Sequence, residues 1–370
     1  MGAADYDAIV LGGGISALTT ALQLQTKGYA TAIIDKPAGA GASGLPGGLA
    51  NPAYGREAKK SWQSEACIES LNRLSELTGD EQSGSAVIKK GILRPAASSA
   101  QADAFKNSIR VNGWKQGWTE WLESGEATER FPLVQAKTGA LWIPVGMTID
   151  LPGLLSGIRA KLTHLGSTLF SFEKTEVYEG ADCHTVISDD REFRSPRIIF
   201  APGSGIDDYP QWAPLKFNRV KGQVVVAAYN GFPDPGCSVA SSGYAAFIGR
   251  NRVVVGSTYE HTYHNSEASV DTGMELLGRF RKMCPQIAGA LTRTEYWAGI
   301  RLTTPDRKPC VGGHWKTRGF FCIAGMGSRG LLMAPLAAEL LADHIHSGTK
   351  LPEEIDIARF YRTRRFMKMT

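Results

Sequence analysis

The clearest alternation of apolar and polar positions lies at the start of the chain. An apolar run from Asp7 to Leu11 is followed by a glycine turn, a helical stretch from Ile15 to Lys27, and a second apolar run from Ala30 to Asp35. Short apolar runs predict buried strands, and spacing near 3.6 residues predicts a helix, which Gly28 would end. We therefore expect one βαβ unit here.

Beyond this unit the pattern alternates between helical and strand-like segments. A long glycine-rich loop precedes an amphipathic helix expected from Glu57 to Leu77, and Trp114, Trp118 and Trp121 follow one another at helical spacing. Further helices are expected at Leu151–Gly166, Asp271–Cys284 and Leu331–Ile345, and strands at Leu169–Val177, His184–Ser188, Arg197–Ala201, Gly222–Tyr229, Tyr244–Ile248, Arg252–Gly256 and Phe320–Ala324.

This order predicts an α/β protein of two interleaved domains, because no low-complexity linker or internal repeat separates the segments. A Rossmann-like cofactor domain would comprise residues 1–87, 149–212 and 298–370. A β-rich α+β substrate domain would comprise residues 88–148 and 213–297.

Composition agrees with a globular enzyme. The 370 residues are 43% hydrophobic and 21% charged, which excludes disordered and fibrous classes. No run of about 20 apolar residues is present and no signal peptide precedes the first strand, so we expect a cytoplasmic protein without a membrane segment. The six cysteines lack metal or disulfide spacing, which predicts reduced thiols and no bound metal.

The first glycine turn has the spacing of a dinucleotide site. Gly12 would make the tight turn, Gly14 would let backbone N–H groups approach a pyrophosphate, and the small Ala17 would allow close helix packing. Asp35 ends the second strand roughly 20 residues later, where its carboxylate would accept hydrogen bonds from a ribose. The sequence therefore predicts that an adenine dinucleotide binds at this turn.

A second glycine pattern spans Gly325 to Gly330, between an expected strand and an expected helix. No acidic residue ends a strand roughly 20 residues later, so a second dinucleotide is not expected. The N–H groups at this helix start would instead stabilise negative charge on a reduced cofactor. An ordinary helix start is the alternative. Arg329, within the turn, is a candidate catalytic residue.

Arg301 is the other candidate catalytic residue. It precedes the turn at Thr304, Pro305 and Asp306, and an arginine at such a strand end would hold a carboxylate through two hydrogen bonds. The alternative is a surface arginine paired with Asp306 or another acid.

Other function classes find less support in the sequence. Phosphate-loop and serine-hydrolase motifs are missing, and Glu260–His264 has the wrong order for a zinc helix. The tryptophans would stack on RNA bases or, as we favour, pack in a core. The tail, with Arg359, Arg362, Arg364, Arg365 and Lys368, is either solvated or an RNA contact. A nicotinamide-dependent reductase, or a nucleotide-binding protein without redox work, remains an alternative.

Five segments together resemble the D-amino-acid oxidase superfamily of FAD-dependent oxidoreductases over nearly the whole chain. They are the first glycine turn, the loop from Ser43 to Asn51, Ile198–Gly203, Gly299–Arg301 with Thr304–Asp306, and the second glycine turn. The last 75 residues are most similar to the flavin domain of the bacterial enzyme that builds methylaminomethyl groups on transfer-RNA wobble uridine, although Met326 stands where that domain usually has histidine. Glycine oxidase and sarcosine oxidase are further relatives.

The resemblance implies a glycine oxidase-like architecture, FAD as cofactor and a small amine or amino acid as substrate. Arg301 would bind the substrate carboxylate, hydride from the carbon beside the amine would pass to flavin N5, and water would hydrolyse the imine. The alternative substrate is carboxymethylaminomethyl-uridine in transfer RNA. Gly299 occupies the place of the cysteine that tethers flavin in sarcosine oxidases, which implies non-covalent FAD. The oligomeric state stays open.

The cofactor residues that the motifs and the resemblance imply are Gly12, Gly14, Ile15, Ser16, Ala17, Asp35, Lys36, Ala42, Ser43, Gly47, Gly48, Leu49, Val177, Ala201, Gly203, Gly325, Met326, Gly327, Ser328, Arg329, Gly330 and Leu331.

Overall fold

The structure, a computed structural model, describes residues 4–37, 41–79 and 85–361. The chain divides into two compact units. Unit 1 comprises Met1–Gly44, Leu155–Val220 and Ile300–Thr370, and unit 2 comprises Leu45–Leu154 and Lys221–Gly299. Residues 45–87, which we expected in the cofactor domain, therefore group with unit 2. The reason is strand pairing, since β3 (Gly48–Ala50) and β6 (Val87–Pro95) both pair with β8 (Ala140–Ile149).

Unit 1 is built on a six-stranded sheet. Its strand order is β19-β20-β13-β1-β2-β9, parallel except for the antiparallel β19. The central strands are fully buried apolar runs, as expected for parallel strands. The strands are β1 (Ala8–Leu11), β2 (Thr31–Asp35), β9 (Thr168–Ser171), β13 (Ile198–Phe200), β19 (Cys310–Gly313) and β20 (Phe320–Ala324).

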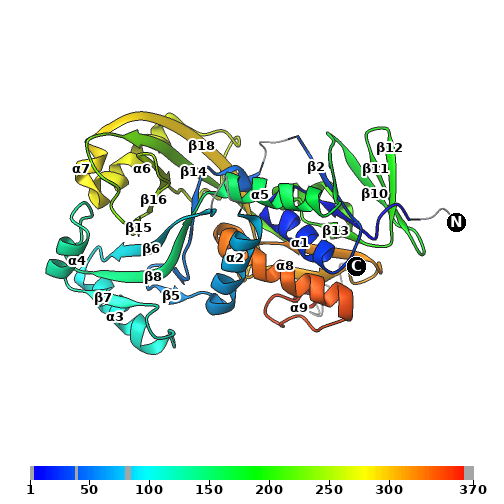
Figure 1. Cartoon of the computed structure of the whole chain (residues 1–370), viewed down its shortest axis with the longest axis horizontal. Coiled ribbons are helices and arrows are strands. Elements are labelled where there is room, and N and C mark those ends of the chain that lie inside the picture. Colours follow the sequence, from blue (N-terminus) through cyan, green and yellow to red (C-terminus); the bar gives the residue numbers. More distant parts are fainter. Residues whose placement is uncertain (1–3, 38–40, 80–84, 362–370) are drawn as a thin grey trace. The chain divides into compact units, whose positions relative to one another are not determined.

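Helices and a small sheet complete unit 1 (Figure 1). The helices are α1 (Ile15–Thr26), α5 (Leu151–His164, which unit 1 contains from Leu155 on), α8 (Gly330–Ser347) and α9 (Ala358–Tyr361). The small sheet contains β10 (Thr175–Tyr178), β11 (His184–Ser188) and β12 (Arg191–Ser195). The single strand expected at Leu169–Val177 was wrong, because β9 joins the large sheet and β10 the small one. The βαβ unit expected from Asp7 to Asp35 is confirmed.

Unit 2 is built on a sheet with strand order β18-β14-β17-β16-β15-β6-β8-β3, in which β7 also pairs with β8. The strands not yet given are β7 (Glu120–Leu122), β14 (Asn218–Tyr229), β15 (Ser238–Ala240), β16 (Tyr244–Phe247), β17 (Arg252–Gly256) and β18 (Leu291–Thr303). A separate hairpin joins β4 (Ala53–Tyr54) and β5 (Lys59–Lys60).

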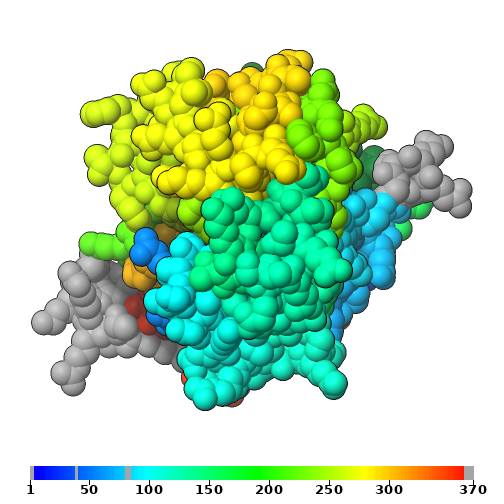
Figure 2. Space-filling model, turned by 90° about the vertical axis from the view of Figure 1, so that its left-hand side faces the viewer, coloured from blue at the N-terminus to red at the C-terminus, as the bar shows by residue number. Residues whose placement is uncertain are grey.

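One face of this sheet supports the main core of unit 2. Leu276 and Phe280 of α6 (Val270–Met283) pack there against alternate residues of β14 and β17, together with α4 (Ser124–Arg130) and α7 (Pro285–Ala288). Figure 2 shows unit 2 from outside, with its cyan to teal residues beside its yellow residues. The opposite face carries a smaller apolar cluster of Val224, Val226, Ala246 and Val254.

The helix expected from Glu57 begins later than the sequence pattern indicated. α2 spans Ser64–Thr78, because the charged residues before it form the β4–β5 hairpin and Gln63 has a left-handed backbone conformation.

Arg94 holds this hairpin from within the core. Its Nη1 donates to the Ala53 carbonyl at 2.8 Å and its Nη2 to the Gly55 carbonyl at 2.6 Å.

Arg94 is therefore a structural cation. It is 6% exposed, lies over the Phe105 ring, and burial lowers its pKa to about 10. Replacing it by methionine should destabilise the protein by about 2–4 kcal/mol, because the buried Ala53 carbonyl and the Gly55 carbonyl both lose a charged donor. Urea unfolding of Arg94→Met and of the exposed control Arg56→Met tests this expectation, and equal midpoints would contradict it.

The three tryptophans do not lie on a helix, although their spacing along the sequence is helical. Helix α3 (Ser99–Val111) ends before them, and a turn leads into β7, which contains Trp121. The packing interpretation nevertheless fits, since Trp118 is buried and Trp114 and Trp121 pack against an apolar cluster around Phe105.

Candidate cofactor and substrate site

The first glycine turn approaches the neighbouring strand too closely for a side chain. Gly12 has a φ of +115°, and a Cβ there would lie 2.5 Å from the Ala201 carbonyl oxygen. Its N–H donates to the Ile34 carbonyl at 2.7 Å. The turn is thus fixed between the carboxyl ends of β2 and β13, where open α/β sheets bind ligands.

The N-terminus of α1 is capped by a hydroxyl from a distant loop. Ser43 Oγ accepts the Ile15 N–H at 3.2 Å, and Gly14 supplies no side-chain cap. Because the hydroxyl accepts here, its own hydrogen is available to an anion. Ala17 is fully buried and Ser16 is partly buried, while Ala42 begins the short 3₁₀ turn Ala42–Gly44.

Asp35 lies directly against the first glycine turn. A Cβ on Gly13 would be 1.9 Å from Asp35 Oδ2 and 2.8 Å from Arg159 Nη2. Burial raises the pKa of Asp35, while hydrogen bonds from Lys36 and Gly13 and the charge of Arg159 oppose that rise. The carboxylate thus lies at the end of β2 against the glycine turn, where a pair of ribose hydroxyls would donate hydrogen bonds to it.

Arg159 is a site residue that the sequence reasoning missed. Its Nη2 donates to the Gly13 carbonyl at 2.9 Å and lies 3.7 Å from Asp35 Oδ2. It comes from α5, far along the chain from the glycine turn. A lone arginine on an amphipathic helix carries no motif that could have identified it.

Other predicted cofactor residues of unit 1 have partners of their own. Lys36 forms an exposed ion pair with Asp208 at 2.8 Å. The carbonyl of Val177, in β10 of the small sheet, accepts a hydrogen bond from Gln211 Nε2 at 3.0 Å. Gly203 has a φ of +58° in the turn that follows β13.

The second glycine turn lies beside the first. A Cβ on Gly330 would be 4.0 Å from Ile15 Cγ2 and 3.4 Å from Met326 Cβ. The turn leaves β20, contains the 3₁₀ segment Gly327–Arg329, and enters α8, which packs along α1 (Figure 1). The N-termini of two helices, with their positive dipole ends, are thus brought together; Ser328 lies in the 3₁₀ segment and Leu331 is the second residue of α8.

Arg301 lies on the strand that ends at this second turn. Thr303 forms a bridge to Met326, and a Cβ on Gly327 would lie 3.3 Å from Thr303 Oγ1. Since alternate strand residues share a face, Arg301 shares one with Thr303. Asp306, the alternative partner considered from sequence, pairs with Arg359 Nε at 2.7 Å.

Arg329 is directed toward the same loop, because its Nη2 donates to the Arg307 carbonyl. A Cβ on Gly325 would be 2.7 Å from Thr304 Cγ2, so this turn also needs glycine. The structure therefore gathers Arg301, Arg329 and the second glycine turn around residues 303–307.

Gly47, Gly48 and Leu49 belong to unit 2. Gly48 and Leu49 pair with Ile149 and Thr148 in the sheet, and a Cβ on Gly47 would be 2.5 Å from Ile248 Cγ2. Leu49 packs against the smaller apolar cluster of that unit.

Three further observations concern the whole described chain. Its residues contain no group of three or more His, Cys, Asp or Glu side chains arranged to hold a metal. None of its helices is long and apolar enough to cross a membrane. Of the basic tail, Arg359 is described, whereas Arg362, Arg364, Arg365 and Lys368 lie outside the described residues.

A mostly parallel sheet with a glycine turn, an acidic residue at the end of its second strand and two adjacent helix N-termini is typical of dinucleotide-binding oxidoreductases. The family model "FAD dependent oxidoreductase" (DAO) matches residues 7–344. The chain therefore belongs to the DAO family of FAD-dependent oxidoreductases and is an enzyme. The expected superfamily is confirmed.

Similar proteins support this assignment over almost the full length. Glycine oxidase of Geobacillus kaustophilus is 26% identical, with 98% of both chains covered, and its crystal structure superposes with a TM-score of 0.80 over 97% of this chain and 98% of that chain. The tRNA 5-methylaminomethyl-2-thiouridine biosynthesis bifunctional protein MnmC of Marinobacter nauticus is 24% identical over 96% of this chain and 58% of its own length.

The expected fold class is confirmed by these structures. Iminodiacetate oxidase of Chelativorans sp. BNC1 superposes with a TM-score of 0.82 at 22% identity, covering 95% of this chain and 98% of that one. At that identity the likeness concerns the fold alone.

Proposed function

We propose that this enzyme oxidises the C–N bond of a glycine-like or N-substituted amino acid, with Arg301 binding the substrate carboxylate. The observation that carries the proposal is the placement of Arg301 on the strand that ends against the second glycine turn. Glycine oxidase, similar over 98% of the chain, supports an amino-acid substrate.

The chain's own residues fit FAD. The Gly12–Ala17 turn and the Ser43 hydroxyl would hold the pyrophosphate, and Asp35, positioned by Arg159, would accept hydrogen bonds from the ribose. Bound FAD supplies the hydride-accepting chemistry. The N–H groups at the start of α8 would stabilise the negative charge of the reduced ring. Arg301 would orient the substrate so that its amine-bearing carbon faces that ring.

The site residues support non-covalent FAD. Gly299 offers no thiol where sarcosine oxidases have a cysteine, and Cys310 is fully buried in β19. Acid precipitation of the yellow protein should therefore release all the flavin into the supernatant. Flavin that stays with the precipitate would contradict non-covalent binding.

The test of the reaction is anaerobic reduction of the bound flavin. Glycine, sarcosine, D-amino acids, proline and a mixed transfer-RNA preparation are each added to the yellow protein, and oxygen is then admitted. Bleaching by glycine or an N-substituted glycine supports the proposal, and recovery on oxygen identifies an oxidase. If none of the carboxylated amines bleaches the bound flavin, the proposal is overturned.

A second candidate function is oxidation of carboxymethylaminomethyl-uridine in transfer RNA. The observation that favours it is similarity to MnmC over 96% of this chain. Arg301 would then bind the carboxylate of the modified base. Bleaching by transfer RNA but not by free amino acids would select this function.

The free thiols of all six cysteines support a cytoplasmic location for either function.

A further inference from the structure

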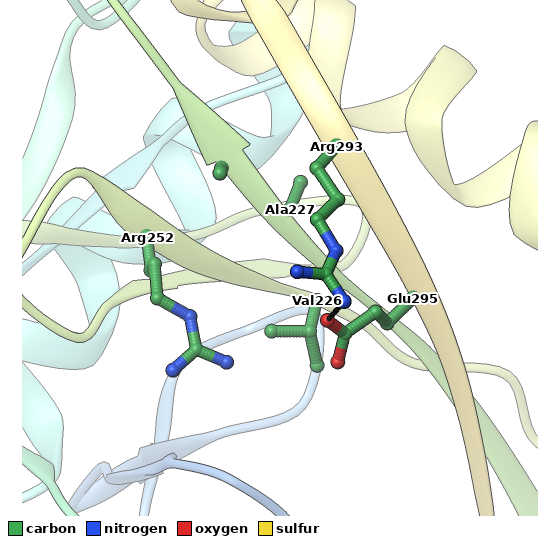
Figure 3. A pocket seen from close by; sticks show the side chains of 6 residues that line it. Val226, Ala227, Arg252, Arg293 and Glu295 are labelled. Atoms are coloured by element: carbon green, nitrogen blue, oxygen red, sulfur yellow. Dashed lines mark ion pairs between the residues drawn. The ribbon is translucent and has the colours of Figure 1, made fainter.

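A hollow in unit 2 is lined by none of the site residues named above. Its volume is about 310 Å³, which is near the lower end of the roughly 300–1,000 Å³ of small-ligand sites. It is lined by Val226, Ala227 and Ala228 of β14, Arg252 of β17, and Arg293 and Glu295 of β18 (Figure 3). All of these residues belong to one unit and to one sheet.

The strand register explains why these side chains meet. Ala228 pairs with Arg252 across β14 and β17, and Val226 pairs with Val254. Alternation along β18 places Arg293, Glu295 and Trp297 on one face of that strand. Trp297 packs against the smaller apolar cluster that contains Val226. The hollow therefore continues an apolar sheet face.

The hollow carries an excess of positive charge. Arg293 Nη2 pairs with Glu295 Oε1 at 2.9 Å, and the two side chains are 77% and 53% exposed. Arg252, in contrast, forms no ion pair with any described residue. Figure 3 shows the guanidinium group of Arg252 to the left of Val226 and that of Arg293 above Val226, next to Glu295. Two guanidinium groups and one carboxylate thus line the same hollow.

We infer that this hollow binds a phosphate group. A phosphate has more acceptor oxygens and carries more negative charge than a carboxylate, so it is the better match for two guanidinium groups, each of which donates two parallel N–H groups. Glu295 holds Arg293 while the hollow is empty and competes with the incoming anion. The phosphate belongs either to a small phosphorylated molecule or to an RNA backbone. This inference goes beyond the proposed function, which uses residues of unit 1.

The experiment is isothermal titration of the yellow, flavin-loaded protein with pyrophosphate and, separately, with mixed transfer RNA. Arg252→Ala and Arg293→Ala should each weaken binding about tenfold, and Glu295→Gln should strengthen it severalfold. The matched control is Arg281→Ala, which removes the same charge from the exposed surface of α6, on the opposite face of the sheet. Circular dichroism verifies that each variant is folded.

The two probes distinguish the sources of phosphate. Arginine-dependent binding of transfer RNA, with a salt slope reduced by roughly 0.7–0.9 for each arginine removed, identifies an RNA backbone. Arginine-dependent binding of pyrophosphate alone identifies a small phosphorylated ligand. No binding of either probe, or equal losses in Arg281→Ala, would overturn the inference. Flavin reduction by glycine, which carries no phosphate, tests the proposed function independently.

Discussion

Arg301→Ala is expected to raise the KM for carboxylated amines by about 100-fold or more, with the flavin still bound. A bidentate arginine–carboxylate pair contributes two charged hydrogen bonds, each about 1.5–3 kcal/mol, and every 1.4 kcal/mol is tenfold in affinity. The loss should fall mainly on KM, because the arginine binds the carboxylate equally in the ground and transition states. Steady-state kinetics, or the substrate dependence of anaerobic flavin reduction, measures it.

Two controls separate binding from folding. Arg301→Lys keeps the positive charge but loses the planar pair of donors, so its KM should lie between those of wild type and Arg301→Ala. A related amine without a carboxylate should be oxidised equally by all three proteins. Wild-type kinetics of Arg301→Ala with carboxylated substrates would remove the carboxylate role from the proposal.

Gly13→Ala is expected to lower FAD affinity by about 10- to 100-fold. The added methyl group would lie 1.9 Å from Asp35 Oδ2, so the carboxylate must rotate away from the turn and from Arg159. The ribose would then lose its charged acceptor, at about 1.5–3 kcal/mol for such a hydrogen bond. Flavin content after gel filtration and a titration of the apoprotein with FAD measure the change.

The matched control for this variant is Gly278→Ala in α6. A Cβ there meets nothing within 4 Å, and glycine is disfavoured inside a helix. This variant should retain wild-type flavin content and equal or greater thermal stability. If Gly13→Ala retained all of its flavin, the Asp35 carboxylate, in the position seen in this structure, would not be the acceptor of hydrogen bonds from the ribose.

Local sequence patterns predicted local structure well. The βαβ unit, the helix in α6 and the strand–turn–helix at β20 and α8 follow from hydrophobic spacing and glycine punctuation, which act over a few residues. The errors occurred where pairing between strands overrode that spacing. β7 formed beside β8 within the tryptophan segment, and the β4–β5 hairpin replaced the first turns of the expected α2.

The sequence by itself determined that a dinucleotide site begins at Gly12, since the requirement for glycine, a helix start and a following acid is local. It also indicated the DAO family. Only the tertiary structure decided which residues share the site. Arg159 hydrogen-bonds to Gly13 from a distant helix, Thr303 forms a bridge to the second glycine turn, and Arg252 and Arg293 line one hollow from two different strands. The proximity of residues so far apart in the sequence depends on strand order and helix packing, which no local pattern encodes.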